Sequence, residues 1–209
     1  MTPIALQLLS LHCYPSFFTD LVTAKLLFKC LGVFHSFRIG ESAMVRGLPI
    51  ITIARNSSIL IGDSAYLVSR SRNTALGVNH PVIIRTLKTG ATICIGSHFR
   101  GSGIVLCAAS GITIGDRVTM GANVVVADTD FHSSDPDIRS SMTDARHAKT
   151  AKVTISDDVF VGMNAVILKG VTIGRRATIG AGSVVTKDVP EGTVAAGNPA
   201  QIISSSVEN

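Results

Sequence analysis

A six-residue repeat of short aliphatic or small residues runs through the C-terminal third of the chain. Its two sets of positions, four residues apart, are Ile155, Val161, Ile167, Ile173, Ile179 and Val185, and Val159, Ala165, Val171, Ala177, Ser183 and Val189. In an α-helix a step of six residues turns the side chain by about 240°, which scatters these positions around the helix. On a strand, an even step keeps them on one face. Because a single strand of this length would far exceed the usual ~3–10 residues, the chain must turn at every repeat, which predicts a parallel β-helix.

The regular part of the repeat is interrupted once. The pattern is ragged before Ile114, regular up to Val126, and resumes at Ile155. The polar stretch between has no apolar period, so we expect a loop at residues 132–152 that leaves the coil and returns. Loops of this length inside compact domains are usually functional or disordered. The predicted parts are an N-terminal segment at 1–37, a β-helix domain at 38–203 that contains the loop, and a C-terminal tail at 204–209.

The N-terminal segment differs in composition from the coil, because it is rich in Leu and Phe and poor in Gly. An amphipathic helix is predicted after the break at Pro15, with apolar side chains at Leu21, Leu27, Phe28 and Leu31 opposite Lys25 and Lys29. Two roles are open for it. The helix either caps the end of the coil, since the terminal face of a solenoid needs a cover, or lies on a membrane surface.

The charge of the chain is diffuse. The 209 residues carry a formal net charge of +5, but the Lys and Arg residues form no run and no aromatic residues alternate with them. This argues against a nucleic-acid partner and favours an anionic cofactor or membrane phosphates. The four cysteines lack CxxC spacing, and neither a secretory signal nor a convincing membrane span is found. We therefore expect a cytoplasmic location, at the inner face of the membrane if the N-terminal helix binds lipid.

The candidate catalytic residue is His132, in the sequence Asp128-Thr129-Asp130-Phe131-His132 at the point where the coil breaks into the loop. Histidine is the side chain best suited to accept a proton near neutral pH. A neighbouring carboxylate would orient the ring and stabilise the imidazolium, and Asp128, Asp130 and Asp135 are all near in sequence. The alternative is an exposed loop histidine with only local hydrogen bonds.

Four blocks of sequence match a known family in this order, at residues 128–132, 159–171, 179–188 and 195–200. In these blocks the chain resembles the hexapeptide-repeat acyltransferases, and among them the galactoside and maltose O-acetyltransferases and those of surface-polysaccharide biosynthesis. The resemblance covers about residues 35–203. It implies a left-handed parallel β-helix, a homotrimer with active sites between subunits, and direct transfer of an acetyl group from acetyl-CoA to a hydroxyl.

The resemblance also implies roles for single residues. His132 matches the family's catalytic histidine, which removes the acceptor proton as the oxygen attacks the thioester. Ser102 matches a polar position near the acceptor, where a donor would serve the oxyanion, and its alternative is an ordinary turn serine. The predicted catalytic set is His132, Asp130 and Ser102. The positions matched to contacts with acetyl-CoA are Phe160, Gly162, Met163, Gly180, Ala181, Thr186 and Lys187.

The roles implied for these donor positions have alternatives, and the sequence departs from the family's residues at some of them. The glycines would let a pantetheine arm approach the backbone, but they also serve the turns of the coil. Lys187 is either a phosphate contact or a solvated lysine. Met163 stands where galactoside-type relatives have serine, and Gln201 and Ser204 stand where they have arginines, so the CoA phosphate contacts remain open.

The expected function is O-acetylation of a sugar or glycan precursor with acetyl-CoA as the donor and no metal. Two other classes are open. An enzyme like the γ-type carbonic anhydrases would need three histidines converging on zinc, and only His98, His132 and His147 are candidates. A non-catalytic β-helix would keep the repeat as a structural or binding module and lack the chemistry.

Overall fold

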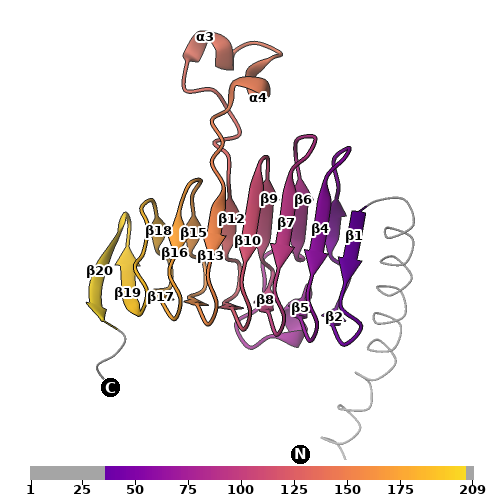
Figure 1. Cartoon of the computed structure of the whole chain (residues 1–209), viewed down its shortest axis with the longest axis vertical. Helices are drawn as coiled ribbons and strands as arrows, with labels where there is room; N and C mark the ends of the chain where they lie inside the picture. The colour runs from indigo at the N-terminus through magenta and orange to yellow at the C-terminus, as the bar shows by residue number, and fades with distance from the viewer. Residues whose placement is uncertain (1–35, 206–209) are drawn as a thin grey trace, which may run out of the picture.

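The structure, a computed structural model, describes residues 36–205, which form a coil of three sheets (Figure 1). The chain visits the sheets in turn, and nearly every strand pairs with the strand three places later in sequence. The predicted N-terminal segment at 1–37, with its helix, lies outside the described residues apart from Ser36 and Phe37, which already belong to the first strand. The parallel β-helix predicted from the six-residue period is confirmed.

The strands are short, as a coil that turns at every repeat requires. Sheet A contains β1 (Ser36–Ile39), β4 (Ser58–Ile61), β7 (Thr92–Ile95), β10 (Gly111–Ile114), β13 (Val153–Ile155) and β16 (Thr172–Ile173). Sheet B contains β2 (Met44–Arg46), β5 (Tyr66–Val68), β8 (Arg100–Ser102), β11 (Thr119–Met120), β14 (Phe160–Val161), β17 (Thr178–Ile179), β19 (Thr193–Gly197) and β20 (Ala200–Ser205). Sheet C contains β3 (Ile50–Thr52), β6 (Ile83–Thr86), β9 (Val105–Ala108), β12 (Val125–Ala127), β15 (Val166–Ile167) and β18 (Val184–Val185). All pairs are parallel except β19 and β20, so strand continues to Ser205, past the predicted start of the tail.

The side chains at the repeat positions form one continuous core. Every residue of the two predicted sets is buried, including Ser183, and Val189 is the most exposed of them at 4%. Burying one such aliphatic side chain stabilises the fold by about 1.5–3 kcal/mol. The narrow interior accepts Val, Ile and Ala in adjacent coils, which accounts for the low aromatic content of 5%.

Three corners separate the sheets. The AB corner contains the turns at 40–43, 62–65, 96–99, 115–118, 156–159 and 174–177. The BC corner contains the turns at 47–49, 69–82, 103–104, 121–124, 162–165 and 180–183. The CA corner contains the turns at 53–57, 87–91, 109–110, 128–152 and 168–171. The turns of neighbouring coils stack closely, because a Cβ on Gly162 would lie 2.4 Å from the backbone N of Ala181 in the next coil.

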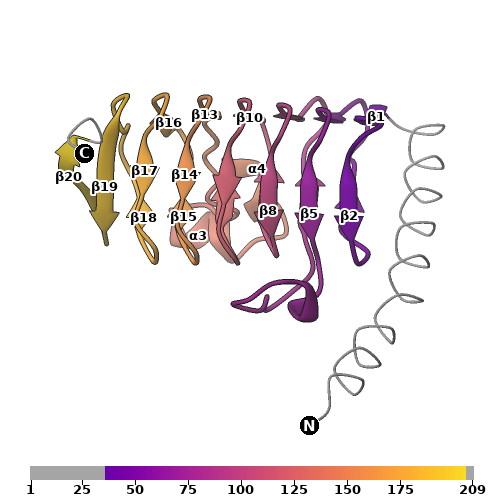
Figure 2. The same cartoon turned by 90° about the horizontal axis from the view of Figure 1, so that it is seen from below.

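Two segments project from this coil. The segment 128–152 at the CA corner, called the loop below, carries α3 (Pro136–Arg139) and α4 (Asp144–His147) and stands away from the sheets (Figure 1). The predicted loop is therefore confirmed, but it begins at residue 128 rather than 132. The segment 69–82 at the BC corner carries the 3₁₀-helix η1 (Ser71–Asn73) and projects between β5 and β6 (Figure 2). This segment lies in the part of the sequence where the repeat is ragged, before Ile114, and the sequence did not distinguish it there.

The outer face of sheet C carries an apolar row along the length of the coil, next to a row that includes Thr52 and Arg85. One in-register row on it, called the sheet C row below, consists of Ile50, Ile83, Val105, Val125, Val166 and Val184. These residues are exposed or half-buried. The outer face of sheet A differs, since a corresponding row there contains Thr113, Thr154 and Thr172. Contiguous exposed apolar surface of this kind marks interaction sites.

Candidate active site at the base of the loop

The loop leaves and rejoins the coil at adjacent points. The backbone N–H of Ala151 donates to the carbonyl oxygen of Asp128 at 2.9 Å, and Thr129 and Thr150 form an antiparallel bridge. The fully buried Asp128 carboxylate accepts backbone N–H groups from the turn of the preceding coil, at Ala109 (2.6 Å), Ser110 (2.7 Å) and Gly111 (2.5 Å). A buried carboxylate requires such donors to offset its loss of hydration. Asp128 therefore fixes the base of the loop.

The backbone turns sharply immediately before His132. Phe131 has a φ of 62°, and the N–H of His132 donates to the carbonyl oxygen of Asp130 at 2.7 Å, which closes a three-residue turn. A second bond runs from the N–H of Phe131 to the hydroxyl of Thr129 at 3.2 Å. A positive φ is unfavourable for a bulky residue, and such conformations concentrate at functional sites. The turn presents His132 at the surface, with 68% of its side chain exposed.

Asp144 orients the His132 ring. Its Oδ2 lies 2.5 Å from Nδ1 of His132, and its Oδ1 accepts the backbone N–H of Ser133 at 2.6 Å. The N–H of Ser133 and the bond to His132 lower the pKa of the Asp144 carboxyl below its usual value, so it stays ionised near neutral pH. A neutral imidazole that donates from Nδ1 keeps its lone pair on Nε2. The arrangement is therefore chemically suited to a general base.

None of the three aspartates considered from the sequence is the partner of His132. Asp128 binds the turn of the preceding coil, and Asp135 accepts the N–H groups of Asp137 and Ile138 as the N-cap of α3. Asp130 forms an ion pair with Lys169, with Oδ1 and Nζ 2.6 Å apart. It also lies at the surface. The sequence left the orienting carboxylate open among these three, and the structure supplies a fourth, Asp144, which α4 brings to the ring from twelve residues along the chain.

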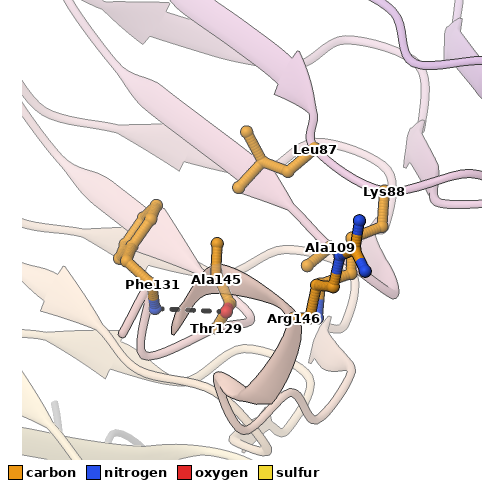
Figure 3. A pocket seen from close by; sticks show the side chains of 7 residues that line it. All are labelled: Leu87, Lys88, Ala109, Thr129, Phe131, Ala145 and Arg146. Atoms are coloured by element: carbon orange, nitrogen blue, oxygen red, sulfur yellow. Dashed lines mark hydrogen bonds between the residues drawn. The ribbon is translucent and has the colours of Figure 1, made fainter. Parts of the chain in front are cut away.

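A pocket of about 590 Å³ lies between the loop and the CA corner. Its lining residues are Leu87, Lys88, Ala109, Thr129, Phe131, Ala145 and Arg146 (Figure 3). The first three come from turns of the coil and the others from the loop. Phe131 directly precedes His132, and Ala145 directly follows Asp144, so the pocket and the His132–Asp144 pair are built from the same two short segments.

The structure separates the other predicted site residues from His132 within one chain. Ser102 ends β8 at the BC corner, whereas His132 lies beyond the opposite end of sheet C. The four residues of β9 cross that sheet, a span of about 13 Å. The predicted donor-binding residues Gly162, Met163, Gly180 and Ala181 are also at the BC corner.

The remaining donor positions lie on sheet B and near the end of the coil. Phe160 is an exposed residue of β14, with 48% of its surface accessible. Thr186 and Lys187 follow β18, and Lys187 is exposed. Of the glycines, Gly162 and Gly180 are both required by coil stacking, since a Cβ on Gly180 would lie 2.8 Å from the Cβ of Ala196.

The histidines proposed for a zinc site do not converge. His98 lies in a turn at the AB corner, while His132 and His147 belong to the loop. Within residues 36–205, no group of three His, Cys, Asp or Glu side chains has an arrangement that could hold a metal ion. In the same range, no helix is long and apolar enough to cross a membrane.

Two segments of the coil match known repeat families. Residues 152–187 match the bacterial transferase hexapeptide family with its six repeats, and residues 100–127 match the hexapeptide repeat of succinyl-transferase. Both segments therefore carry hexapeptide repeats of the kind found in transferases. They lie on either side of the loop, so the matched repeats account for part of the scaffold and leave the loop outside them.

Two curated relatives of the chain are acetyltransferases. A galactoside O-acetyltransferase of Lactococcus lactis is 42% identical over 91 residues, which are 44% of this chain and 42% of that protein. A 2,3,4,5-tetrahydropyridine-2,6-dicarboxylate N-acetyltransferase of Staphylococcus aureus is 55% identical over 56 residues, which are 27% of this chain and 23% of that protein. The chain therefore spans less than half the length of these curated relatives.

A solved structure shows the same architecture. The hexapeptide-repeat-containing acetyltransferase of Vibrio cholerae superposes with a TM-score of 0.51 at 25% identity, over 82% of this chain and 74% of that one. The predicted left-handed parallel β-helix is thereby confirmed. The family match also confirms the resemblance found in the sequence blocks.

Proposed function

We propose that this chain is an acetyl-CoA-dependent acetyltransferase that modifies a hydroxyl of a sugar or glycan precursor, with His132 as the general base. The observation that carries the proposal is the hydrogen bond between Nδ1 of His132 and Asp144 beside the pocket. It leaves Nε2 of the exposed ring as the proton acceptor. The acetyltransferase names of the relatives support the transferred group.

In this mechanism Nε2 of His132 removes the proton of the acceptor hydroxyl as the oxygen attacks the thioester carbonyl of acetyl-CoA. A hydroxyl is a poor nucleophile until a base is placed within hydrogen-bonding distance of it. The tetrahedral intermediate collapses, the C–S bond breaks, and the thiolate takes the proton from the imidazolium. Asp144 remains ionised throughout and stabilises the imidazolium that forms in between.

The acetyl donor is assigned to the BC corner. Gly162, Met163, Gly180 and Ala181 present backbone there, and Phe160 is exposed on the adjoining sheet. An extended amide-containing arm pairs well with such backbone edges. Thr186 and Lys187 would meet the nucleotide end, and Ser102 at the same corner would donate to the oxyanion.

A second copy of the chain completes the site in this proposal. Ser102 lies at the BC corner with four of the donor positions, Gly162, Met163, Gly180 and Ala181, while His132 lies at the CA corner of the same chain. One chain therefore holds the two halves at opposite ends of sheet C. A homotrimer that packs the BC corner of one copy against the CA corner of the next would join them. The exposed sheet C row offers apolar surface for that packing.

The decisive experiment is a thiol-release assay with acetyl-CoA and a panel of sugar acceptors. Replacing the base, His132→Ala, is expected to lower kcat by ~10²–10⁴-fold. His147→Ala is the matched control, because His147 is an exposed histidine of the same loop. Equal rates for His132→Ala and wild type would reject the assignment. If wild type is inactive and acetyl-CoA leaves the Tm unchanged at millimolar concentration, the non-catalytic alternative is favoured.

We also propose a cytoplasmic location at the inner face of the membrane, through the N-terminal segment. The basic and apolar residues of that segment in the sequence are the only support for it. Co-sedimentation of the full chain with anionic but not with neutral liposomes is the expected result. Recovery of all the protein in the supernatant with both would reject it.

A further inference from the structure

One side chain of the coil reaches the base of the loop from the next repeat. Lys169 belongs to the turn 168–171 at the CA corner, and its Nζ lies 2.6 Å from Oδ1 of Asp130. This turn follows β15, which pairs with β12, the strand that leads into the loop. The next residue bonds to the other end of the loop, because the N–H of Gly170 donates to the carbonyl oxygen of Ala151 at 2.9 Å. The turn therefore contacts both the segment that leaves the coil and the segment that returns to it.

Asp130 is held by three contacts, which fix its backbone as well as its side chain. Its N–H donates to the carbonyl oxygen of Lys149 at 3.0 Å, and its own carbonyl oxygen accepts the N–H of His132 at 2.7 Å. The ion pair with Lys169 holds the carboxylate. The bond from His132 closes the turn in which Phe131 has a φ of 62°. A shift of Asp130 would thus move the turn that presents the His132 ring.

This ion pair suits a positioning role better than a stabilising one. The side chains of Lys169 and Asp130 are 30% and 40% exposed, and ion pairs near the surface contribute only about 0–1 kcal/mol to stability. A general base depends instead on geometry, since a displacement of about 1 Å can lower a rate by ~10²-fold. The loop stands away from the sheets, so a base carried on it needs contacts with the coil to stay in place (Figure 1). The contact of Asp128 with the preceding coil is four residues from His132, whereas Asp130 is two residues from it.

We propose that Lys169 is a positioning residue for His132 and acts through Asp130. The ammonium group holds the Asp130 carboxylate against the coil, and the backbone of Asp130 holds the turn that carries the base. Without the ion pair this turn loses its link to the next repeat, and the ring leaves its bond with Asp144 for part of the time. This inference rests on the proposed function, in which His132 is the base.

The kinetic test measures acetyl transfer from acetyl-CoA to an acceptor that the wild type modifies. Lys169→Met keeps the length of the side chain and removes its charge, and kcat is expected to fall about 10–100-fold. Lys169→Arg can still pair with Asp130 and should retain most of the activity. Lys152→Met, which removes an exposed lysine at the same corner, is the matched control and should have the kcat of the wild type. The Tm should stay close to that of the wild type in all three variants, because the pair lies near the surface.

A double-mutant cycle measures whether Lys169 acts through Asp130. Asp130→Ala alone should lower kcat as much as Lys169→Met does, and the double variant should be no slower than either, because both changes remove the same contact. Losses that multiply in the double variant would overturn the inference. Full activity of Lys169→Met would overturn it as well.

Nuclear magnetic resonance of the His132 ring gives a readout that needs no reaction. At a pH where the ring is neutral, its nitrogen chemical shifts in the wild type should report the tautomer protonated at Nδ1, which the bond to Asp144 selects. In Lys169→Met the ring should populate both tautomers, and Lys169→Arg should resemble the wild type. An unchanged ring in Lys169→Met would reject the positioning role. A ring that responds, in a protein whose His132→Ala variant is as active as the wild type, would retain the positioning by Lys169 and reject the proposed function.

Discussion

Nδ1 of His132 lies 2.5 Å from the carboxylate of Asp144, although twelve residues and two short helices separate them along the chain. The regular coil contributes neither residue. It contributes instead the buried contact of Asp128 with the preceding turn, which holds both ends of the loop in place. The geometry of the proposed base is thus set inside the loop, while the contact of Asp128 with the coil holds the ends of the loop.

Asp144→Asn should lower kcat with little change in KM, because the ring loses the partner that orients it. The loss should not exceed the ~10²–10⁴-fold that a general base contributes. A merely structural Asp144 would change the Tm rather than kcat, so both are measured. Asp137→Asn, another exposed loop carboxylate, is the control.

Asp128→Asn should destabilise the fold, because an amide NH₂ would replace one oxygen that accepts backbone N–H groups of the preceding turn. Leaving buried donors without an acceptor costs about 1–3 kcal/mol each, so we expect a loss of about 3 kcal/mol. Urea denaturation followed by circular dichroism measures it. The exposed Asp130→Asn should change stability much less, as surface ion pairs contribute about 0–1 kcal/mol. Equal effects of the two substitutions would contradict the anchoring role of Asp128.

Gly162→Ala tests the close stacking of coils at the BC corner. Its Cβ would lie 2.4 Å from the backbone N of Ala181, so the turn must shift, at a cost of about 1–3 kcal/mol or more. Gly182→Ala is the comparison, because a Cβ there meets nothing within 4 Å but the residue has a φ of 69°. Its cost should be only the conformational ~1–2 kcal/mol. A Gly162→Ala protein as stable as wild type would show that the coils are spaced more widely at this turn than the 2.4 Å approach implies.

Val105→Asp places a charge in the middle of the sheet C row. If that row packs between copies, the substitution should convert a trimer to monomers in size-exclusion chromatography with light scattering, because an unpaired buried charge is strongly unfavourable. Thr113→Asp makes a comparable change on the outer face of sheet A in the same coil and should leave the assembly intact. Assemblies of unchanged mass in both variants would place the interface elsewhere.

Asp158→Asn should reduce stability at neutral pH and make no difference in strong acid. Arg117 and then Arg175 lower the pKa of the Asp158 carboxyl from 3.8 to about 2. A carboxyl with a lowered pKa stabilises the folded state above its unfolded value, and the gain is lost as the pH falls through the folded value. The Tm difference between variant and wild type should therefore be full at pH 7 and shrink between about pH 4 and 2. A difference independent of pH would contradict the ion pair.

The core was predictable from the sequence because strand alternation and the turn at every sixth residue leave little freedom. Ser183 illustrates this, since its position in the repeat alone placed a hydroxyl in the interior. The structure supplies the partner it needs, the backbone N–H of Gly197 at 3.1 Å. The position of His132 at the edge of the coil was equally predictable, because the interruption of the six-residue repeat is itself visible in the sequence.

The loop interior was not predictable, since no period constrains it. Asp144 lies there among exposed polar residues, and nothing in the sequence distinguishes it from Asp135 or Asp137. The pocket was missed for the same reason, because Leu87 and Lys88 belong to a turn in the ragged part of the repeat. Contacts between that turn and the loop exist only after the coils have stacked.

Val125 pairs directly with Val166, although the loop lies between them in sequence, so the register of the scaffold does not depend on how long the loop is. A loop of another length or sequence, joined at the same two end points, would leave this pairing and the stacking of the neighbouring coils unchanged.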